Sequence, residues 1–173
     1  KFTIPSEIGK LMQLETIRMH NNFLEGQIPS EIGDMSSLTD MQLQDNLLTG
    51  SVPTTIGYLS RLEFMNVGAN ELSGPIASEI GRLTQLTMLS LHRNRWTGPI
   101  PSEVGLVVSL KAMVLYHNRL FGEIPSELGE LVALTHLSLW SNRLTGSVPV
   151  EIEQLSLLQE VYLDDNDLTA GLE

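Results

Sequence analysis

The 173-residue chain contains no cysteine, which excludes disulfide frameworks, thiolate metal sites and cysteine nucleophiles. Cationic residues are also few, because 10 Lys and Arg stand against 21 Asp and Glu and give a formal net charge of -11. An acidic surface does not attract nucleic acid or anionic membranes. No apolar run approaches the roughly 18 residues that a membrane-spanning helix requires.

Catalytic signatures are missing as well. The sequence has no G-x-S-x-G motif, no phosphate-binding loop and no H-E-x-x-H motif. The acidic run from Asp164 to Asp167 does not have the spacing of a calcium loop. We therefore expect no enzymatic activity, no cofactor and no metal site.

What the sequence does contain is a repeat of 24 residues, marked by one asparagine per copy. Apolar residues lie five and three residues before each asparagine and two residues after it. Twelve of the fourteen glycines occupy only two positions of the repeat. The chain is therefore seven copies of one structural unit. We number these repeats 1 to 7 by their asparagines, which are Asn22, Asn46, Asn70, Asn94, Asn118, Asn142 and Asn166.

The apolar spacing inside each unit predicts how it folds. In an L-x-L segment the two apolar side chains point to the same side of a short strand, and the residues beside them point to solvent. One such strand cannot bury its apolar side alone, but stacked copies form a continuous core. The asparagine stands where the chain leaves the strand, so its amide can satisfy backbone groups in the turn. We expect these asparagines to form a buried structural ladder.

The unit reads L-x-x-L-x-L-x-x-N-x-L-x-G-x-I-P-x-x-I-G-x-L, as in residues 134–155. This pattern resembles the plant-type class of leucine-rich repeat proteins across the whole chain; among the departures are Trp96 for leucine, Ala77 for proline and Glu153 for glycine. The resemblance implies an α/β repeat solenoid that is curved, with a parallel β-sheet on its concave side and short helical or 3-10 turns on its convex side. We expect residues 1–173 to form a single solenoid.

Two expectations concern the turns and the ends. In the P-S-E-I-G segments, serines such as Ser30 and Ser126 are suited to cap helical turns, and the following glutamates, including Glu127, form an acidic ridge on the convex side. Members of this class usually carry cysteine-paired caps, which are absent here. We therefore expect the chain to be a segment of a longer protein, or its ends to be covered by flanking repeats or a partner.

The functional hypothesis rests on the positions whose residues differ from one repeat to the next. Turns 1–3 and 7 are mainly acidic on the predicted concave side, whereas turns 4–6 combine cationic and aromatic side chains with no acidic residue nearby. Arginine, tyrosine and tryptophan dominate binding hot spots. The predicted binding patch consists of His92, Arg93, Arg95, Tyr116, His117, Arg119, His136, Trp140, Arg143 and Tyr162. We expect the three arginines that follow the asparagines to stack on neighbouring strands. The segment Arg93-Asn94-Arg95 resembles an arginine pair with which some plant receptors hold a peptide carboxylate.

The leading hypothesis is a non-catalytic recognition module that binds a protein or peptide carrying acidic groups. One alternative is that the chain is a structural subunit of a larger assembly. Another is that the serine or threonine found at one position of most repeats forms a column that binds polysaccharide or ice. A third is that the basic and aromatic residues form only a solvated surface whose side chains stack on one another. The resemblance implies an extracellular or cell-surface location. Because no N-x-S/T sequon and no cysteine occurs, an intracellular or organelle-lumen location also remains open.

Overall fold

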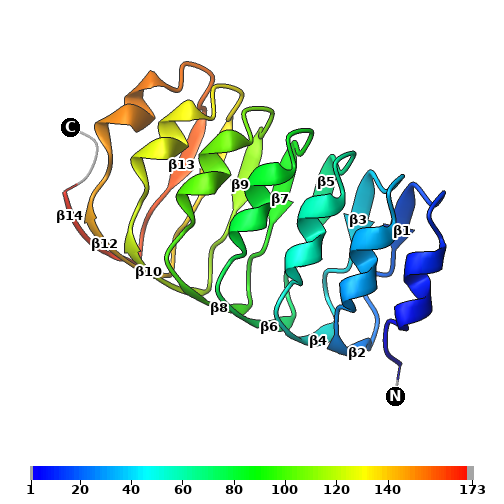
Figure 1. Cartoon of the computed structure of the whole chain (residues 1–173). Coiled ribbons are helices and arrows are strands. Elements are labelled where there is room, and N and C mark those ends of the chain that lie inside the picture. Colours follow the sequence, from blue (N-terminus) through cyan, green and yellow to red (C-terminus); the bar gives the residue numbers. More distant parts are fainter. Residues whose placement is uncertain (1, 171–173) are drawn as a thin grey trace.

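The computed structural model describes residues 2–170, which form a stack of strand–strand–helix units (Figure 1). The first strands of the units pair in parallel into one seven-stranded sheet. It consists of β1 (Thr16–Arg18), β3 (Asp40–Gln42), β5 (Phe64–Asn66), β7 (Met88–Ser90), β9 (Ala112–Val114), β11 (His136–Ser138) and β13 (Glu160–Tyr162).

A second parallel sheet of seven strands flanks the first. It consists of β2 (Glu25–Gln27), β4 (Leu47–Gly50), β6 (Glu71–Gly74), β8 (Arg95–Gly98), β10 (Arg119–Glu123), β12 (Arg143–Ser147) and β14 (Asp167–Ala170). The third side is a row of 3-10 helices, namely η1 (Ser6–Lys10), η2 (Ser30–Asp34), η3 (Thr54–Tyr58), η4 (Ser78–Arg82), η5 (Ser102–Leu106), η6 (Ser126–Glu130) and η7 (Val150–Gln154).

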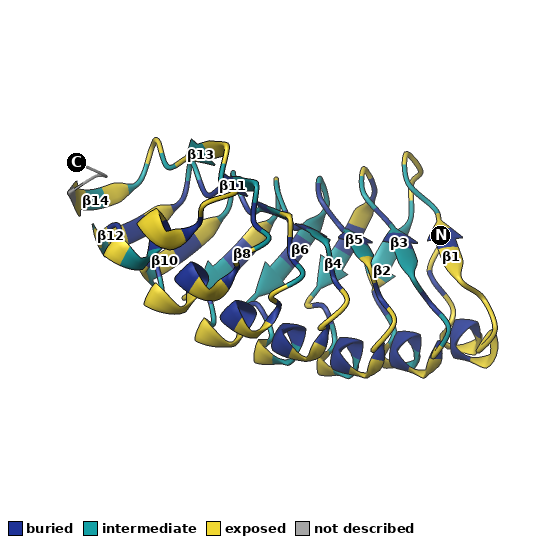
Figure 2. Cartoon of the chain, turned by 90° about the horizontal axis from the view of Figure 1, so that it is seen from above, coloured by how far each residue is buried: buried dark blue, intermediate teal, exposed yellow. Residues whose placement is uncertain are grey.

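The stack is curved, with the first sheet on the inner side and the 3-10 helices on the outer side (Figure 2). The predicted solenoid, with its parallel inner sheet and short helical turns, is therefore confirmed. The second sheet was not part of the prediction. The two sheets also differ in register. Paired residues on neighbouring strands of the first sheet are 24 positions apart in the sequence, as are Met88 and Ala112. In the second sheet they are 22 positions apart, as are Thr97 and Arg119.

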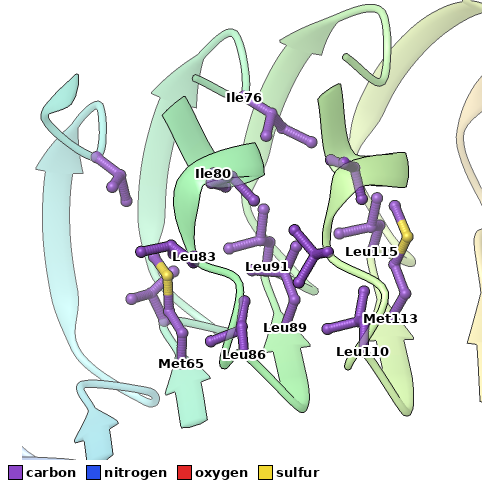
Figure 3. Close-up of a cluster of buried hydrophobic side chains, with 14 of the residues drawn as sticks. Met65, Ile76, Ile80, Leu83, Leu86, Leu89, Leu91, Leu110, Met113 and Leu115 are labelled. Atoms are coloured by element: carbon purple, nitrogen blue, oxygen red, sulfur yellow. The ribbon is translucent and has the colours of Figure 1, made fainter. Parts of the chain in front are cut away.

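The core is a single hydrophobic cluster that runs from Ile4 to Leu155. Leu89 and Leu91, the two apolar residues of one L-x-L segment, are both buried, as the spacing predicts. Figure 3 shows them converging with Leu83 and Leu86 on the interior between sheet and helix. Each repeat buries its apolar side chains against those of its neighbours, so the core is shared along the whole stack.

The outer turns stack closely because each of η1 to η6 carries a glycine, whereas η7 has Glu153 at this position. A Cβ atom on Gly81 would meet the backbone oxygen of Glu103 in the next turn, so a side chain there would force the two turns apart. The expected serine caps are wrong. The turn at η2 is closed by a backbone bond from the Ile32 N–H to the Pro29 oxygen (3.0 Å), and the Ser30 hydroxyl lies 3.1 Å from Glu31 Oε2 instead.

The ladder asparagines tie each repeat to the one before it. Asn118 Oδ1 accepts a hydrogen bond from the Trp96 N–H of the preceding repeat at 3.1 Å. Its Nδ2 donates to the oxygens of Leu91 in the preceding repeat (3.2 Å) and of Leu115 and Tyr116 in its own repeat (2.9 and 3.3 Å). One amide thus serves four backbone groups in two repeats.

The expected burial of the ladder is only partly right. Asn46 and Asn142 are buried, most of the others are half-buried, and Asn22 is exposed. The amides lie in the loop that leaves the first sheet, so they are surrounded by backbone groups rather than by the apolar core. Asn22 donates only to carbonyls of its own repeat, those of Met19 and His20.

This difference in bonding leads to a stability prediction. Asn118→Leu is expected to lower the free energy of unfolding by about 1–3 kcal/mol, because it leaves buried backbone groups without partners. Asn22→Leu is the matched control, and it is expected to cost less than about 1 kcal/mol because it breaks bonds within one exposed loop only. The denaturation midpoints of the two variants measure this. Equal midpoints for Asn118→Leu and the unchanged chain would contradict the ladder's role.

Candidate binding site

Three rings form a stacked row where the chain leaves neighbouring strands of the inner sheet. His92, Tyr116 and Trp140 follow β7, β9 and β11 at the same position of the repeat. The centroids of His92 and Tyr116 are 4.9 Å apart, and those of Tyr116 and Trp140 are 5.0 Å apart with an interplanar angle of 14°. All three residues are half-buried. The 24-residue register of the inner sheet places these rings in line, so they form one continuous stack.

Two further groups hold this row in place. The ring of His117 packs edge-on against Tyr116 and Trp140, with centroid distances of 5.5 and 4.2 Å. At the other end, the His92 ring leans over Gly68, where any Cβ atom would collide with the imidazole. Burial, followed by the charge of Arg93, lowers the pKa of His92, which favours the neutral form of this ring. Its Nδ1 lies 2.8 Å from the hydroxyl of Ser90.

The residue before each ladder asparagine adopts a left-handed backbone conformation, with φ between 49° and 56°. Repeats 1, 2 and 7 place Asn21, Asp45 and Asp165 there, and Asn and Asp tolerate this conformation best among residues with a side chain. Repeats 3 to 6 place Ala69, Arg93, His117 and Ser141 there instead. The guanidinium carbon of Arg93 lies 6.0 Å from the centroid of the Tyr116 ring. Of the two patch residues at this position, Arg93 is therefore the more strained, since His, like Asn and Asp, is enriched in this conformation.

The three arginines that follow the asparagines do not lie on the inner sheet, which corrects the sequence expectation. Arg95, Arg119 and Arg143 begin β8, β10 and β12 of the flanking sheet. The 22-residue register sets Arg119 opposite Thr97, two residues beyond Arg95. The Cα atoms of successive arginines are therefore about 8 Å apart rather than one strand spacing. This offset reduces the like-charge repulsion within the column.

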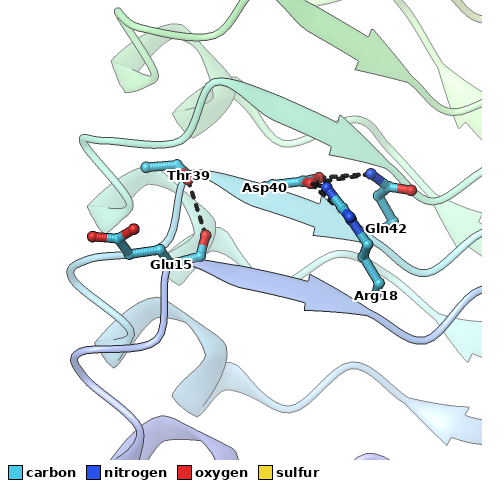
Figure 4. Close-up of polar contacts among 5 residues, drawn as sticks. All are labelled: Glu15, Arg18, Thr39, Asp40 and Gln42. Carbon is cyan, nitrogen blue, oxygen red and sulfur yellow. Dashed lines mark hydrogen bonds and ion pairs between the residues drawn. The ribbon is translucent and has the colours of Figure 1, made fainter.

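The arginines also differ in their partners. Arg95 forms an ion pair with Glu71 at 3.2 Å, whereas within residues 2–170 no carboxylate pairs with Arg119 or Arg143. The N-terminal part of the inner sheet shows the opposite situation (Figure 4). There Arg18 binds Asp40 at 2.9 Å, and Asp40 also accepts hydrogen bonds from Gln42. Arg119 and Arg143 are thus exposed cations available to a partner.

His136 and Tyr162 lie beyond the ring row, toward repeat 7. Their centroids are 5.6 Å apart, and both contact Glu160 Oε2, His136 through Nδ1 at 2.8 Å and Tyr162 through its hydroxyl at 3.2 Å. The charge of the Glu160 carboxylate, with that hydrogen bond, raises the pKa of Tyr162. Between this group and the ring row is a shallow pocket of about 420 Å³, lined by Tyr116, His136, Ser138, Trp140, Tyr162 and Asp164.

The predicted patch is therefore two adjoining surfaces, a ring row with its pocket on the inner side and an arginine column on the flank. Sequence reasoning missed Gly68, Glu160 and Asp164 as parts of this site, although Gly68 stands outside the two regular glycine positions. Among the described residues, no three His, Asp or Glu side chains gather as a metal site. Within the same range, no helix has the length and apolar character needed to cross a membrane.

Comparison with known proteins identifies the repeat. The model of the leucine-rich repeat family matches residues 13–35, 109–131 and 133–155. Among solved structures, the chain is similar to the ectodomain of the receptor kinase GASSHO1/SCHENGEN3 from Arabidopsis thaliana in complex with CASPARIAN STRIP INTEGRITY FACTOR 2 (35% identity, TM-score 0.94). It is also similar to the plant peptide hormone receptor RGFR1 in complex with RGF2 (34%, TM-score 0.95) and to a leucine-rich repeat protein of Leptospira interrogans (33%, TM-score 0.86).

These similarities cover nearly all of this chain but only part of each relative. They extend over 96%, 96% and 99% of this chain, and over 20%, 27% and 42% of the three relatives. No curated protein matches the sequence. The family model, the 24-residue period and the two stacked parallel sheets agree with one another. The chain belongs to the leucine-rich repeat family, and its repeats are of the plant type.

Proposed function

We propose that this chain is a non-catalytic recognition module that binds a protein or peptide across the inner surface of repeats 4–7. The observation that carries the proposal is the half-buried row of His92, Tyr116 and Trp140. Aromatic side chains add contact area at low entropic cost, and stacking removes the mobility that binding would otherwise have to suppress. A binding surface of this kind is preorganised.

The strained backbone supports the same assignment. A residue other than Gly, Asn, Asp or His in the left-handed region costs roughly 1–2 kcal/mol, and such strain concentrates at functional sites. Repeats 1, 2 and 7 use the less costly Asn or Asp, while Arg93 brings a cation to the row from the same position. The chain thus places the Arg93 side chain beside Tyr116 at the expense of stability.

The charges favour a ligand that carries acidic groups. Arg119 and Arg143 are exposed, and a planar guanidinium suits carboxylate, sulfate or phosphate groups. The two plant relatives described above were solved in complex with CASPARIAN STRIP INTEGRITY FACTOR 2 and RGF2, and the second is named as a peptide hormone receptor. We infer that this chain likewise binds a peptide or protein segment, in an extracellular or cell-surface setting.

The test begins with a displayed random peptide library that is selected on the immobilised chain. For the selected peptides, Arg119→Glu is expected to weaken binding about tenfold or more and to reduce its salt dependence, because exposed charge pairs are screened by salt. Trp140→Ala is expected to weaken binding by a similar factor through loss of a hot-spot ring. Affinities measured by calorimetry at two salt concentrations provide the readout.

The control is Glu127→Arg on the outer turn η6, which changes charge by the same amount with opposite sign and leaves the inner surface intact. We expect it to change affinity by less than about twofold. If the selected peptides were instead insensitive to Arg119→Glu and Trp140→Ala but lost through Glu127→Arg, the outer side would be the partner surface. The structural-subunit hypothesis would then replace this one.

A second prediction separates strain from binding. Arg93→Asn is expected to raise the free energy of unfolding by on the order of 1 kcal/mol, because Asn tolerates the left-handed conformation, and to weaken peptide binding. Ala69→Asn relieves the same strain in repeat 3, outside the ring row, and is expected to stabilise the chain without changing affinity. Thermal unfolding and calorimetry on both variants measure this. If neither variant is more stable than the unchanged chain, the backbone at these positions is not strained.

A further inference from the structure

The stacked row ends at Trp140, and its last ring has one uncovered side. Tyr116 stacks on Trp140 from the side of repeat 5. In repeat 7 the equivalent position holds Asp164, whose short side chain cannot continue the stack. The pocket beside the end of the row is lined by Trp140, Tyr162 and Asp164, together with Tyr116, His136 and Ser138. It therefore offers an aromatic wall together with a carboxylate.

The surroundings of this pocket are strongly acidic. After Arg143 the sequence contains no Lys or Arg, whereas Glu160, Asp164, Asp165 and Asp167 all fall in repeat 7. The Glu160 carboxylate is already engaged by His136 and Tyr162. By contrast, among residues 2–170 no side chain donates a hydrogen bond to the Asp164 carboxylate or pairs with it. Asp164 is exposed and free to receive a cation.

We propose that this pocket binds the guanidinium group of an arginine on the peptide ligand. A guanidinium is planar, stacks on an indole ring and donates two parallel hydrogen bonds to a carboxylate. Trp140 and Tyr162 supply the rings, and Asp164 supplies the acceptor. An ammonium group matches this arrangement less well, because it is compact, strongly hydrated and has no flat surface.

This proposal rests on the proposed function and makes it more specific. A ligand with an arginine for the pocket and an acidic group for Arg119 or Arg143 would have one allowed orientation. In the reversed orientation, the ligand's arginine would meet the arginine column and its acidic group would meet Asp164. Like charges in contact exclude such arrangements. The change from basic repeats 4–6 to acidic repeat 7 thus sets the direction of the bound peptide.

The pocket can be tested without knowing the natural ligand. N-acetyl-arginine amide is titrated into the unchanged chain, with N-acetyl-citrulline amide as the uncharged isostere and N-acetyl-lysine amide as the alternative cation. Tryptophan fluorescence reports the site, because Trp140 lines the pocket while Trp96, the other tryptophan, is buried at 1% exposure. We expect a dissociation constant on the order of 1 mM for the arginine amide, as suits a ligand of this size. The citrulline amide should bind at least about tenfold more weakly, and the lysine amide several-fold more weakly.

Two isosteric variants locate the effect. Asp164→Asn is expected to weaken binding of the arginine amide about tenfold. Asp165→Asn removes the same charge one residue later, outside the pocket lining, and is expected to change the affinity less than about twofold. Equal binding of the arginine and citrulline amides, or equal effects of the two variants, would overturn the proposal.

Failure of the pocket proposal can be told apart from failure of the proposed function. If library peptides bind in an Arg119-dependent way while the arginine amide does not bind, the pocket proposal is wrong and the recognition module stands. If the arginine amide binds in an Asp164-dependent way while no library peptide binds, the pocket is a cation site and the peptide proposal is wrong.

Discussion

The side-chain amide of the ladder asparagine is the interaction on which the rest of the structure depends. It satisfies backbone groups of its own repeat and of the repeat before it, so neighbouring units are bound in one fixed offset. Because that offset is the same at every step, each position of the repeat forms a continuous column that follows the curve of the stack. The apolar columns form the core, and the glycine column lets the outer turns approach. Without this regular offset, no row of side chains could line up across the strands.

The same regularity explains how the candidate site is built. Columns that face the core are fixed by packing, whereas outward columns are free to vary without loss of stability. Repeats 4–6 use one such column for the ring row, and the strands beneath hold each ring at one strand spacing from the next. Gly68 makes room for His92 at one end, and Asp164 leaves Trp140 uncovered at the other. The row therefore has a defined start and a defined open end.

Much of this was predictable from the sequence, since a 24-residue period with L-x-L segments dictates stacked parallel strands. The alignment of His92, Tyr116 and Trp140 followed from their shared position in the repeat. The placement of Arg119 did not, because the pattern gives no sign that a second sheet begins there or that its register is 22 residues. Asp164 could not be singled out from the sequence, since the role proposed for it depends on the ring of Trp140 in the preceding repeat. Such neighbour effects arise only once the stack is assembled.

The central claim is that the inner ring row is the place of ligand contact. The most direct measurement is an NMR titration of the chain with a selected peptide, followed at the two indole N–H signals. We expect the Trp140 signal to shift while that of Trp96, which is buried in the core, stays unchanged. Shifts confined to the outer turns η3 to η6, with the Trp140 signal unchanged, would contradict it.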